Sequence, residues 1–163
     1  MNKTGDITIS CQLQESQVNQ LSEQFQTLVN RADEARAGSH SPYSGFQVGA
    51  ALLLESGEIV IGSNQENAAY PSGLCAERTA LFWAGANYPH TKILAIAVTV
   101  PDRAEHIPFP CGSCLQVISE YQHKQDQAIE ILLKHPQSQQ VYLAKGVQNL
   151  LPFAFEKSHL PKD

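Results

Sequence analysis

Several features are missing from this 163-residue sequence, and each absence excludes a class of protein. There is no run of eighteen apolar residues and no apolar segment near the N-terminus, so we expect neither a membrane span nor a signal peptide. Lys and Arg number 11 against 16 Asp and Glu, and they form no basic stripe, which argues against nucleic acid as a partner. Internal repeats are also lacking. We expect one domain, residues 1–163, with a full hydrophobic core.

Cysteine is scarce too, and the positions of the few cysteines are informative. Of the four, Cys75 stands alone, whereas Cys111 and Cys114 form a Cys-x-x-Cys pair. Catalytic zinc sites use three protein ligands and leave the fourth position open. No further cysteine or histidine lies at the spacing of a structural zinc site. The three cysteines therefore predict a catalytic zinc site, and thiolates kept for a metal favour a reducing, cytoplasmic compartment.

The residues that follow these cysteines predict two helices. Residues 76–86 contain no proline and no interior glycine except Gly85, and the run after Cys114 has apolar residues at one-turn spacings. The ligands would thus lie at helix N-termini, where the positive helix end favours thiolate. Glu77, in the first turn, is too close to Cys75 for both to bind one ion. It is better placed to move protons beside the metal.

Other interpretations of the cysteines remain open at this point. The Cys-x-x-Cys pair alone would also fit a redox site, and free cysteines are often buried apolar residues. Cys11 lies in no pattern, and we expect it to be a small, partly buried side chain. A zinc-stabilised binding module is the alternative that is not an enzyme, but such a module would have little use for Glu77 beside an open coordination position.

The periodicity of the apolar residues predicts an α/β fold. We expect an amphipathic helix over residues 15–37, two buried helices after the cysteines, and a polar loop with Asn64 and Glu66 upstream of Cys75. We expect five strands, at residues 47–54, 58–62, 92–100, 128–133 and 141–143. This order predicts a three-layer α/β/α sandwich around a five-stranded mixed sheet. Residues 1–13 would add an edge strand or form an arm.

Several motifs occur together and in order. They are Ser41-Pro42-Tyr43-Ser44 with Phe46, Val48-Gly49-Ala50-Ala51, Asn64, Glu66-Asn67-Ala68, Cys75-Ala76-Glu77-Arg78-Thr79-Ala80, and Pro110-Cys111-Gly112-Ser113-Cys114 with Gln116-Val117. By these motifs the chain resembles the cytidine deaminase family in its compact three-cysteine form, over residues 41–155. The resemblance implies zinc-dependent hydrolysis of cytidine and 2′-deoxycytidine to uridine and 2′-deoxyuridine, as part of pyrimidine salvage.

The resemblance also implies roles for individual residues. Cys75, Cys111 and Cys114 would hold one zinc ion per subunit, and Glu77 would shuttle protons. Contacts with the nucleoside would come from the Phe46 ring, from Asn64 and Glu66 at the ribose hydroxyls, and from the Ala76 N–H at the pyrimidine carbonyl. A homotetramer is implied, with Phe155 reaching the pocket of an adjacent subunit.

One residue departs from the family pattern. Leu115 stands where many relatives have an arginine, so Arg78 would be left to offset more of the net negative charge of a three-thiolate zinc site. Deaminases of the same fold that act on guanine, a nucleotide, a nucleoside antibiotic or a base in RNA are the rival enzymes. A phosphate-bearing substrate would need positively charged residues at the entrance to the site, and this acidic chain lacks them. Glu66 would also repel a phosphate group.

Overall fold

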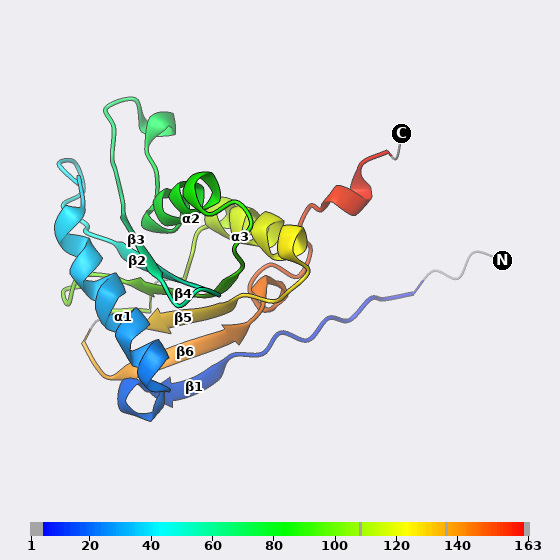
Figure 1. Cartoon of the computed structure of the whole chain (residues 1–163), viewed down its shortest axis with the longest axis horizontal. Coiled ribbons are helices and arrows are strands. Elements are labelled where there is room, and N and C mark those ends of the chain that lie inside the picture. The colour runs from blue at the N-terminus through cyan, green and yellow to red at the C-terminus, as the bar shows by residue number, and fades with distance from the viewer. Residues whose placement is uncertain (1–4, 108, 136, 162–163) are drawn as a thin grey trace.

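A mixed β-sheet lies between two helical layers in the computed structural model, which describes residues 5–107, 109–135 and 137–161 (Figure 1). The strands are β1 (Gln14–Gln17), β2 (Gly49–Leu54), β3 (Ile59–Ser63), β4 (Ile93–Thr99), β5 (Glu130–Lys134) and β6 (Gln140–Lys145). The α-helices are α1 (Glu23–Ala35), α2 (Ala76–Asn87) and α3 (Gly112–Gln125). Helix α1 covers one face of the sheet, and α2 and α3 lie side by side on the other. The predicted three-layer α/β/α class is confirmed.

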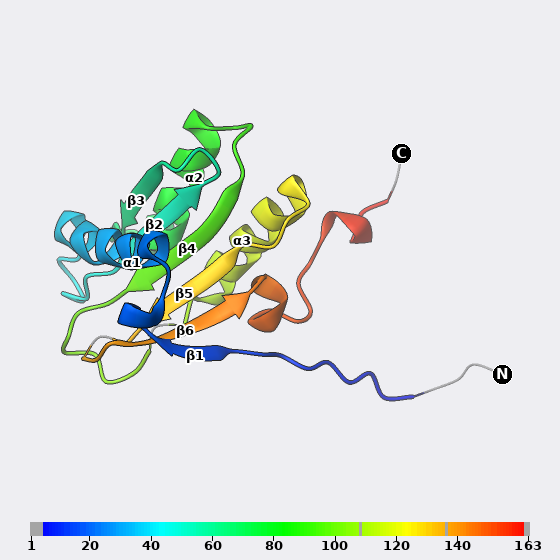
Figure 2. The same ribbon diagram turned by 60° about the horizontal axis from the view of Figure 1, so that its bottom comes forward.

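The sheet brings the two halves of the chain together in the order β1-β6-β5-β4-β2-β3. Strands β4 and β5 are parallel and are joined by a crossover through α3, whereas the other neighbouring pairs are antiparallel. Figure 2 shows β4 near the middle of the sheet. The loop that leaves the carboxyl end of β4 leads directly to Cys111. The topology therefore places this loop and the start of α3 next to α2.

Two separate hydrophobic cores explain why the central strands are apolar at nearly every position. Leu52 and Leu54 of β2 face α2 and α3, where they join a core that includes Leu81 and Ile118. The intervening residue Leu53 faces α1 and joins the second core. Successive side chains of a strand point to opposite faces of a sheet, so a strand covered on both faces buries every residue.

The strands expected at residues 47–54 and 58–62 are present as β2 and β3, which form a hairpin and pair from Gly49↔Ser63 to Leu53↔Ile59. Gly57 in the connecting turn has φ 88°, a left-handed conformation that glycine adopts without a Cβ penalty. The turn is closed by hydrogen bonds from Gly57 N to Leu54 O (2.9 Å) and from Leu54 N to Glu58 O (2.9 Å).

The sheet has six strands in the described part of the chain, so the prediction of five strands is wrong, and β1 is the strand that was not expected. Its residues, Gln14–Gln17, carry no apolar alternation and pair with β6 through the backbone. Backbone pairing leaves no trace in side-chain polarity, so the strand was invisible in the sequence. Residues 1–13 were expected to form an edge strand or an arm. Residues 1–4 lie outside the described part of the chain, and residues 5–13 form no strand and lead into β1 as an extended arm (Figure 2).

The predicted helix over residues 15–37 begins too early. Helix α1 starts only at Glu23, after Ser22, whose Oγ accepts a hydrogen bond from Phe25 N (3.3 Å) as an N-cap. Val18 satisfies the helical apolar period but belongs to a 3-10 turn, η1 (Val18–Gln20), and packs in the same core as α1. Helical periodicity could not separate the two segments, because both bury apolar residues against one face of the sheet. No helix in the described part of the chain is long and apolar enough to cross a membrane.

Candidate metal centre and substrate cleft

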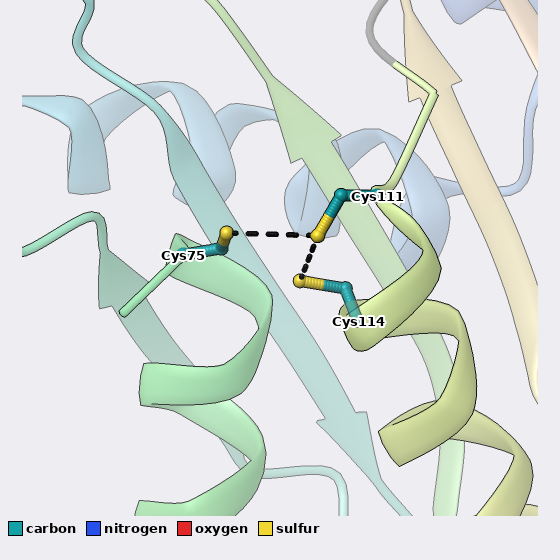
Figure 3. A group of neighbouring side chains, drawn as sticks. All are labelled: Cys75, Cys111 and Cys114. Carbon is teal, nitrogen blue, oxygen red and sulfur yellow. Dashed lines mark hydrogen bonds between the residues drawn. The ribbon is translucent and has the colours of Figure 1, made fainter. Parts of the chain in front are cut away.

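The three cysteines of the sequence pattern come together where α2 and α3 begin (Figure 3). Cys75 is the N-cap of α2, Cys111 is the N-cap of α3, and Cys114 lies in the first turn of α3. Cys111 Sγ is 3.9 Å from Cys75 Sγ and 3.5 Å from Cys114 Sγ. All three sulfur atoms lie within 4.8 Å of one another. The tertiary structure thus joins residues that are 36 positions apart in the chain.

The spacing of the sulfur atoms fits a zinc ion. Thiolates bound to zinc at about 2.3 Å in a tetrahedral arrangement have sulfur atoms about 3.8 Å apart. The two distances of 3.9 and 3.5 Å from Cys111 lie on either side of this value. A set of three thiols with no fourth Cys, His, Asp or Glu in the described cluster is the donor set of an open, catalytic zinc site.

Close packing of α2 against β3 positions Cys75. A Cβ atom at Gly62 of β3 would lie 2.6 Å from Ala80 N and 2.7 Å from Ala76 O. These are contacts with helix backbone, which cannot move aside as a flexible side chain would. Glycine at position 62 therefore lets the first turn of α2 approach the sheet and carries Cys75 to its place beside α3.

The site favours thiolate at Cys75. A hydrogen bond from the Cys114 thiol, together with one from Arg78, lowers the pKa of Cys75 to about 5, against the opposing effect of burial. Conversely, the pKa of Cys114 is raised, because its thiol donates to Cys75 and because it is buried. The two opposite shifts mean that Cys75 loses its proton at a lower pH than Cys114 does.

Glu77 is a buried carboxylic acid beside these sulfur atoms. Its residue is only 4% exposed. Burial raises the pKa of Glu77, and the negative charge of Cys75 raises it further. A carboxyl group whose pKa has been moved upward next to a metal site is suited to accept and release protons near neutral pH.

Arg78 supplies the positive charge of the site. Its Nη2 atom lies 3.7 Å from Cys75 Sγ, and this hydrogen bond to the sulfur raises the pKa of Arg78. Leu115, the departure noted in the sequence, is 7% exposed and packs in the core formed with α2. Leu115 therefore serves the core and brings no charge to the sulfur atoms.

A cleft of about 590 Å³ opens beside Cys75 and Arg78. Its remaining lining residues come from three loop segments: Tyr43, Ser44, Val48, Asn64, Gln65, Glu66, Asn67, Tyr70, Gly73 and Leu74. Two of the predicted substrate residues, Asn64 and Glu66, are among them. The volume suits a small molecule of nucleoside size.

Asn64 and Glu66 also organise the loop that carries Phe46. Asn64 Oδ1 accepts hydrogen bonds from Val48 N (2.8 Å) and Ser39 Oγ (2.6 Å), and its Nδ2 donates to Phe46 O (2.9 Å). Glu66 accepts from Tyr43 N (2.9 Å), from Ser44 N (3.3 Å) and from the Ser44 hydroxyl. These hydrogen bonds lower the pKa of Glu66. The bond from the Ser44 hydroxyl has the largest effect, and the bond from the Tyr43 N–H has the next largest. Glu66 is therefore a carboxylate at the cleft.

The other predicted contacts are placed differently. Phe46 is 37% exposed on the same loop but does not line the cleft. Ala76 is fully buried as the first residue of α2, where helix geometry leaves the backbone N–H without an intrahelical partner. Phe155 lies in the C-terminal tail, 60% exposed, with its ring 5.6 Å from that of His159. It does not line the cleft of its own chain.

Two residues of the cleft, Tyr43 and Tyr70, were not predicted from the sequence, and the burial of Cys11 was predicted wrongly. Tyr43, noted in the sequence only as part of the Ser41-Pro42-Tyr43-Ser44 motif, is 55% exposed and lines the cleft, and its ring meets Tyr70 edge to face at 6.1 Å. Tyr70 was not singled out, because an aromatic residue in a turn-rich loop carries no pattern. Cys11, expected to be partly buried, is exposed on the arm.

Comparison with known proteins defines the class. Residues 22–128 match the family described as the cytidine and deoxycytidylate deaminase zinc-binding region. The chain belongs to this family. Among its relatives, the chain is similar to the cytidine deaminase of Mycobacterium tuberculosis (36% identity, covering 83% of this chain and 92% of the relative). It is also similar to the cytidine deaminase of Halalkalibacterium halodurans (50% identity, covering 58% of this chain and 70% of the relative). The crystal structure of cytidine deaminase from Burkholderia pseudomallei superimposes with a TM-score of 0.71 at 36% identity, covering 83% of this chain and all of that one.

Proposed function

We propose that the protein is a zinc-dependent cytidine deaminase that hydrolyses cytidine and 2′-deoxycytidine to uridine and 2′-deoxyuridine with release of ammonia. The observation that carries this function is the convergence of three cysteine sulfur atoms beside the buried Glu77 carboxyl group. Three thiolates and an adjacent proton-transfer group form the zinc deaminase constellation. The similarity to cytidine deaminases over most of the chain supports the choice of substrate.

Cys75, Cys111 and Cys114 would hold one zinc ion per subunit. The bound ion would supply Lewis acidity, which lowers the pKa of water toward neutrality. Arg78 and the N-terminal ends of α2 and α3 offset the negative charge of the thiolates. This compensation matters because uncompensated thiolate charge would weaken the Lewis acid.

Glu77 would carry out the proton transfers. It takes the proton from the attacking water and delivers it to N3 of the pyrimidine, which makes C4 electrophilic. The oxygen of the water bonds to C4. Glu77 then moves the proton of the new C4 hydroxyl group to the amino group, the C4–N bond breaks, and ammonia leaves as the C4 carbonyl group of uridine forms. The raised pKa of Glu77 suits both steps, because a group near its pKa can accept and release a proton at similar cost.

The cleft residues would hold the nucleoside. Asn64 and Glu66 line the cleft with groups able to bind ribose hydroxyls, and Glu66 disfavours a phosphate at the same place. The Phe46 ring, on the loop that both residues organise, would pack on the nucleoside. The Ala76 N–H, at the positive end of α2, would donate to the pyrimidine carbonyl.

We also propose that residues 1–163 form one domain, since β1 and β6 from the two ends of the chain pair in one sheet. The resemblance to the family is the reason to propose a homotetramer of such chains. Phe155, exposed on the tail and outside its own cleft, would contact the pocket of a neighbouring subunit. A reducing compartment suits a site made of thiols, and we place the enzyme in pyrimidine salvage in the cytoplasm.

The proposed function is tested by following the ultraviolet absorbance of cytidine and deoxycytidine with purified protein, before and after removal of zinc. We expect zinc-dependent loss of both substrates, with uridine or deoxyuridine as product and restoration on adding zinc. Guanine, deoxycytidylate and buffer alone serve as controls. If guanine or deoxycytidylate is converted and cytidine is not, the compound that is converted replaces cytidine as the assigned substrate. If the zinc-loaded protein converts none of these compounds, the assignment as a deaminase is refuted and a zinc-stabilised binding module is favoured.

A further inference from the structure

The loop that carries Phe46 is held from one side by a negative charge. The turn over residues 41–45 is closed by a hydrogen bond from Gly45 N to Ser41 O (2.9 Å). Its N–H groups at Tyr43 and Ser44 point to the Glu66 carboxylate, at 2.9 and 3.3 Å. A carboxylate that accepts backbone N–H groups makes charge-assisted hydrogen bonds, which are stronger than neutral ones.

A positive charge holds the same turn from another side. Arg103 Nη2 donates a hydrogen bond to Gly45 O at 2.5 Å. Gly45 has φ 63°, a left-handed conformation that favours glycine, and its carbonyl group meets the guanidinium in this conformation. A Cβ atom at Gly45 would lie 3.3 Å from Arg103 Nη2, so the two residues are in close contact. Glu66 thus binds the donors of the turn, and Arg103 binds its last acceptor before Phe46.

Arg103 is itself anchored at its backbone. It lies in the loop from β4 to α3, inside a turn closed by a hydrogen bond from Ala104 N to Pro101 O (2.9 Å). Gln137 Nε2, from the segment between β5 and β6, donates to Asp102 O (2.8 Å). Two hydrogen bonds therefore fix the backbone on both sides of Arg103, and the guanidinium extends from a held position.

We propose that Arg103 is a positioning residue for the nucleoside: it ties the loop that carries Phe46 to the loop that delivers Cys111. The inference rests on the proposed function and adds a residue outside the motifs that indicate the family. Arg103 acts through Gly45 and not on the reacting atoms. Its loss frees Phe46 and weakens the binding of substrate, whereas the cysteines and Glu77 keep their places.

The test compares Arg103→Ala, Arg103→Lys and the zinc-loaded full-length wild type. Glu105→Ala is the matched control, because Glu105 is exposed on the same loop and makes no side-chain hydrogen bond or ion pair in the described part of the chain. We expect Arg103→Ala to raise KM for cytidine about three- to tenfold, with kcat within twofold and zinc content unchanged. Lysine keeps a charged donor and should restore part of the loss. Gln137→Ala should raise KM by a smaller factor.

Amide hydrogen exchange gives a readout that does not depend on turnover. In Arg103→Ala we expect faster exchange in a peptide spanning residues 41–48, with unchanged exchange in α1. Unchanged KM and unchanged exchange would overturn the inference, and so would a loss of zinc or of kcat at constant KM. A wild type that fails to convert cytidine refutes the proposed function instead, and the exchange measurement then still decides whether Arg103 holds the loop.

Discussion

The Arg78 guanidinium lies 3.7 Å, Nη2 to Sγ, from Cys75, one residue away from Glu77 in the sequence and on the same first turn of α2. In this contact the Arg78 side chain donates a hydrogen bond to one of the three sulfur atoms. Leu115, in the position where an arginine was expected by resemblance, lies in the core. The charge of the zinc site therefore depends on Arg78 more than it would in a chain with both arginines.

The positive charge of Arg78 should support both turnover and zinc binding. Arg78→Ala should lower kcat for cytidine about tenfold and weaken zinc binding, because a charge-assisted hydrogen bond to Cys75 is lost. Arg78→Lys, which keeps the charge, is the matched control. The same alanine substitution in a relative with arginine at the Leu115 position should cost less. Near-normal kcat and zinc content in Arg78→Ala would contradict the idea.

Glu77→Gln should lower kcat by about 10²–10⁴-fold while zinc content stays at the wild-type level. The amide keeps the size of the carboxyl group but cannot accept and return a proton. Kinetics and elemental analysis of the same preparation decide the matter. If the variant keeps most of its turnover, Glu77 is not the proton shuttle.

The pH profile of the wild type should reflect the same residue. Because the pKa of Glu77 is raised from its ordinary value of 4.5, the carboxylate needed to accept a proton is lost at a higher pH than for an exposed glutamate. We expect kcat/KM to fall on the acidic side with a midpoint above pH 4.5. A profile that is flat down to this pH would argue against a buried carboxylate as the base.

Metal-free protein should show a thiolate at Cys75 in mildly acidic solution. Its pKa is lowered from 9.0 to about 5, so the ultraviolet absorbance of a thiolate should appear as pH rises through about 5. The ionisation stabilises the fold fully above pH 9.0, the ordinary pKa of the thiol, and this stabilisation is lost as pH falls through about 5. Cys75→Ser is the control and should lack the step. A first thiolate step near pH 9 would show that the sulfur cluster does not lower the pKa.

Gly62→Ala should disturb the metal site from a distance. The added Cβ would meet backbone atoms of Ala76 and Ala80 at 2.7 and 2.6 Å and push the start of α2 away from the sheet. We expect a loss of about 1–3 kcal/mol in the free energy of unfolding and weaker zinc binding. Gly112→Ala is the control, because nothing lies within 4 Å of its Cβ position. Denaturant unfolding and zinc titration of both variants test this, and equal behaviour would contradict it.

Much of the fold could be inferred from the sequence, because the buried strands and helices carry their own apolar periodicity. β2, β4 and β5, and the helices after the cysteines, lie close to their expected positions. The elements that were missed or misplaced share one property: their places depend on backbone partners. β1 is polar and pairs through main-chain groups with β6, and the true start of α1 depends on the Ser22 cap.

The sequence by itself determined the chemistry of the site: three cysteines with no fourth ligand, a glutamate in the first turn of a helix, and an arginine beside it. These inferences need only residue types and short spacings, which local structure preserves. Only the tertiary structure decided that Cys111 lies 3.9 Å from Cys75, that Asn64 and Glu66 hold the Phe46 loop, and that Arg103 reaches Gly45. Such contacts join segments far apart in the chain, and they form because β4, β5 and their crossover helix place two loops beside one helix end.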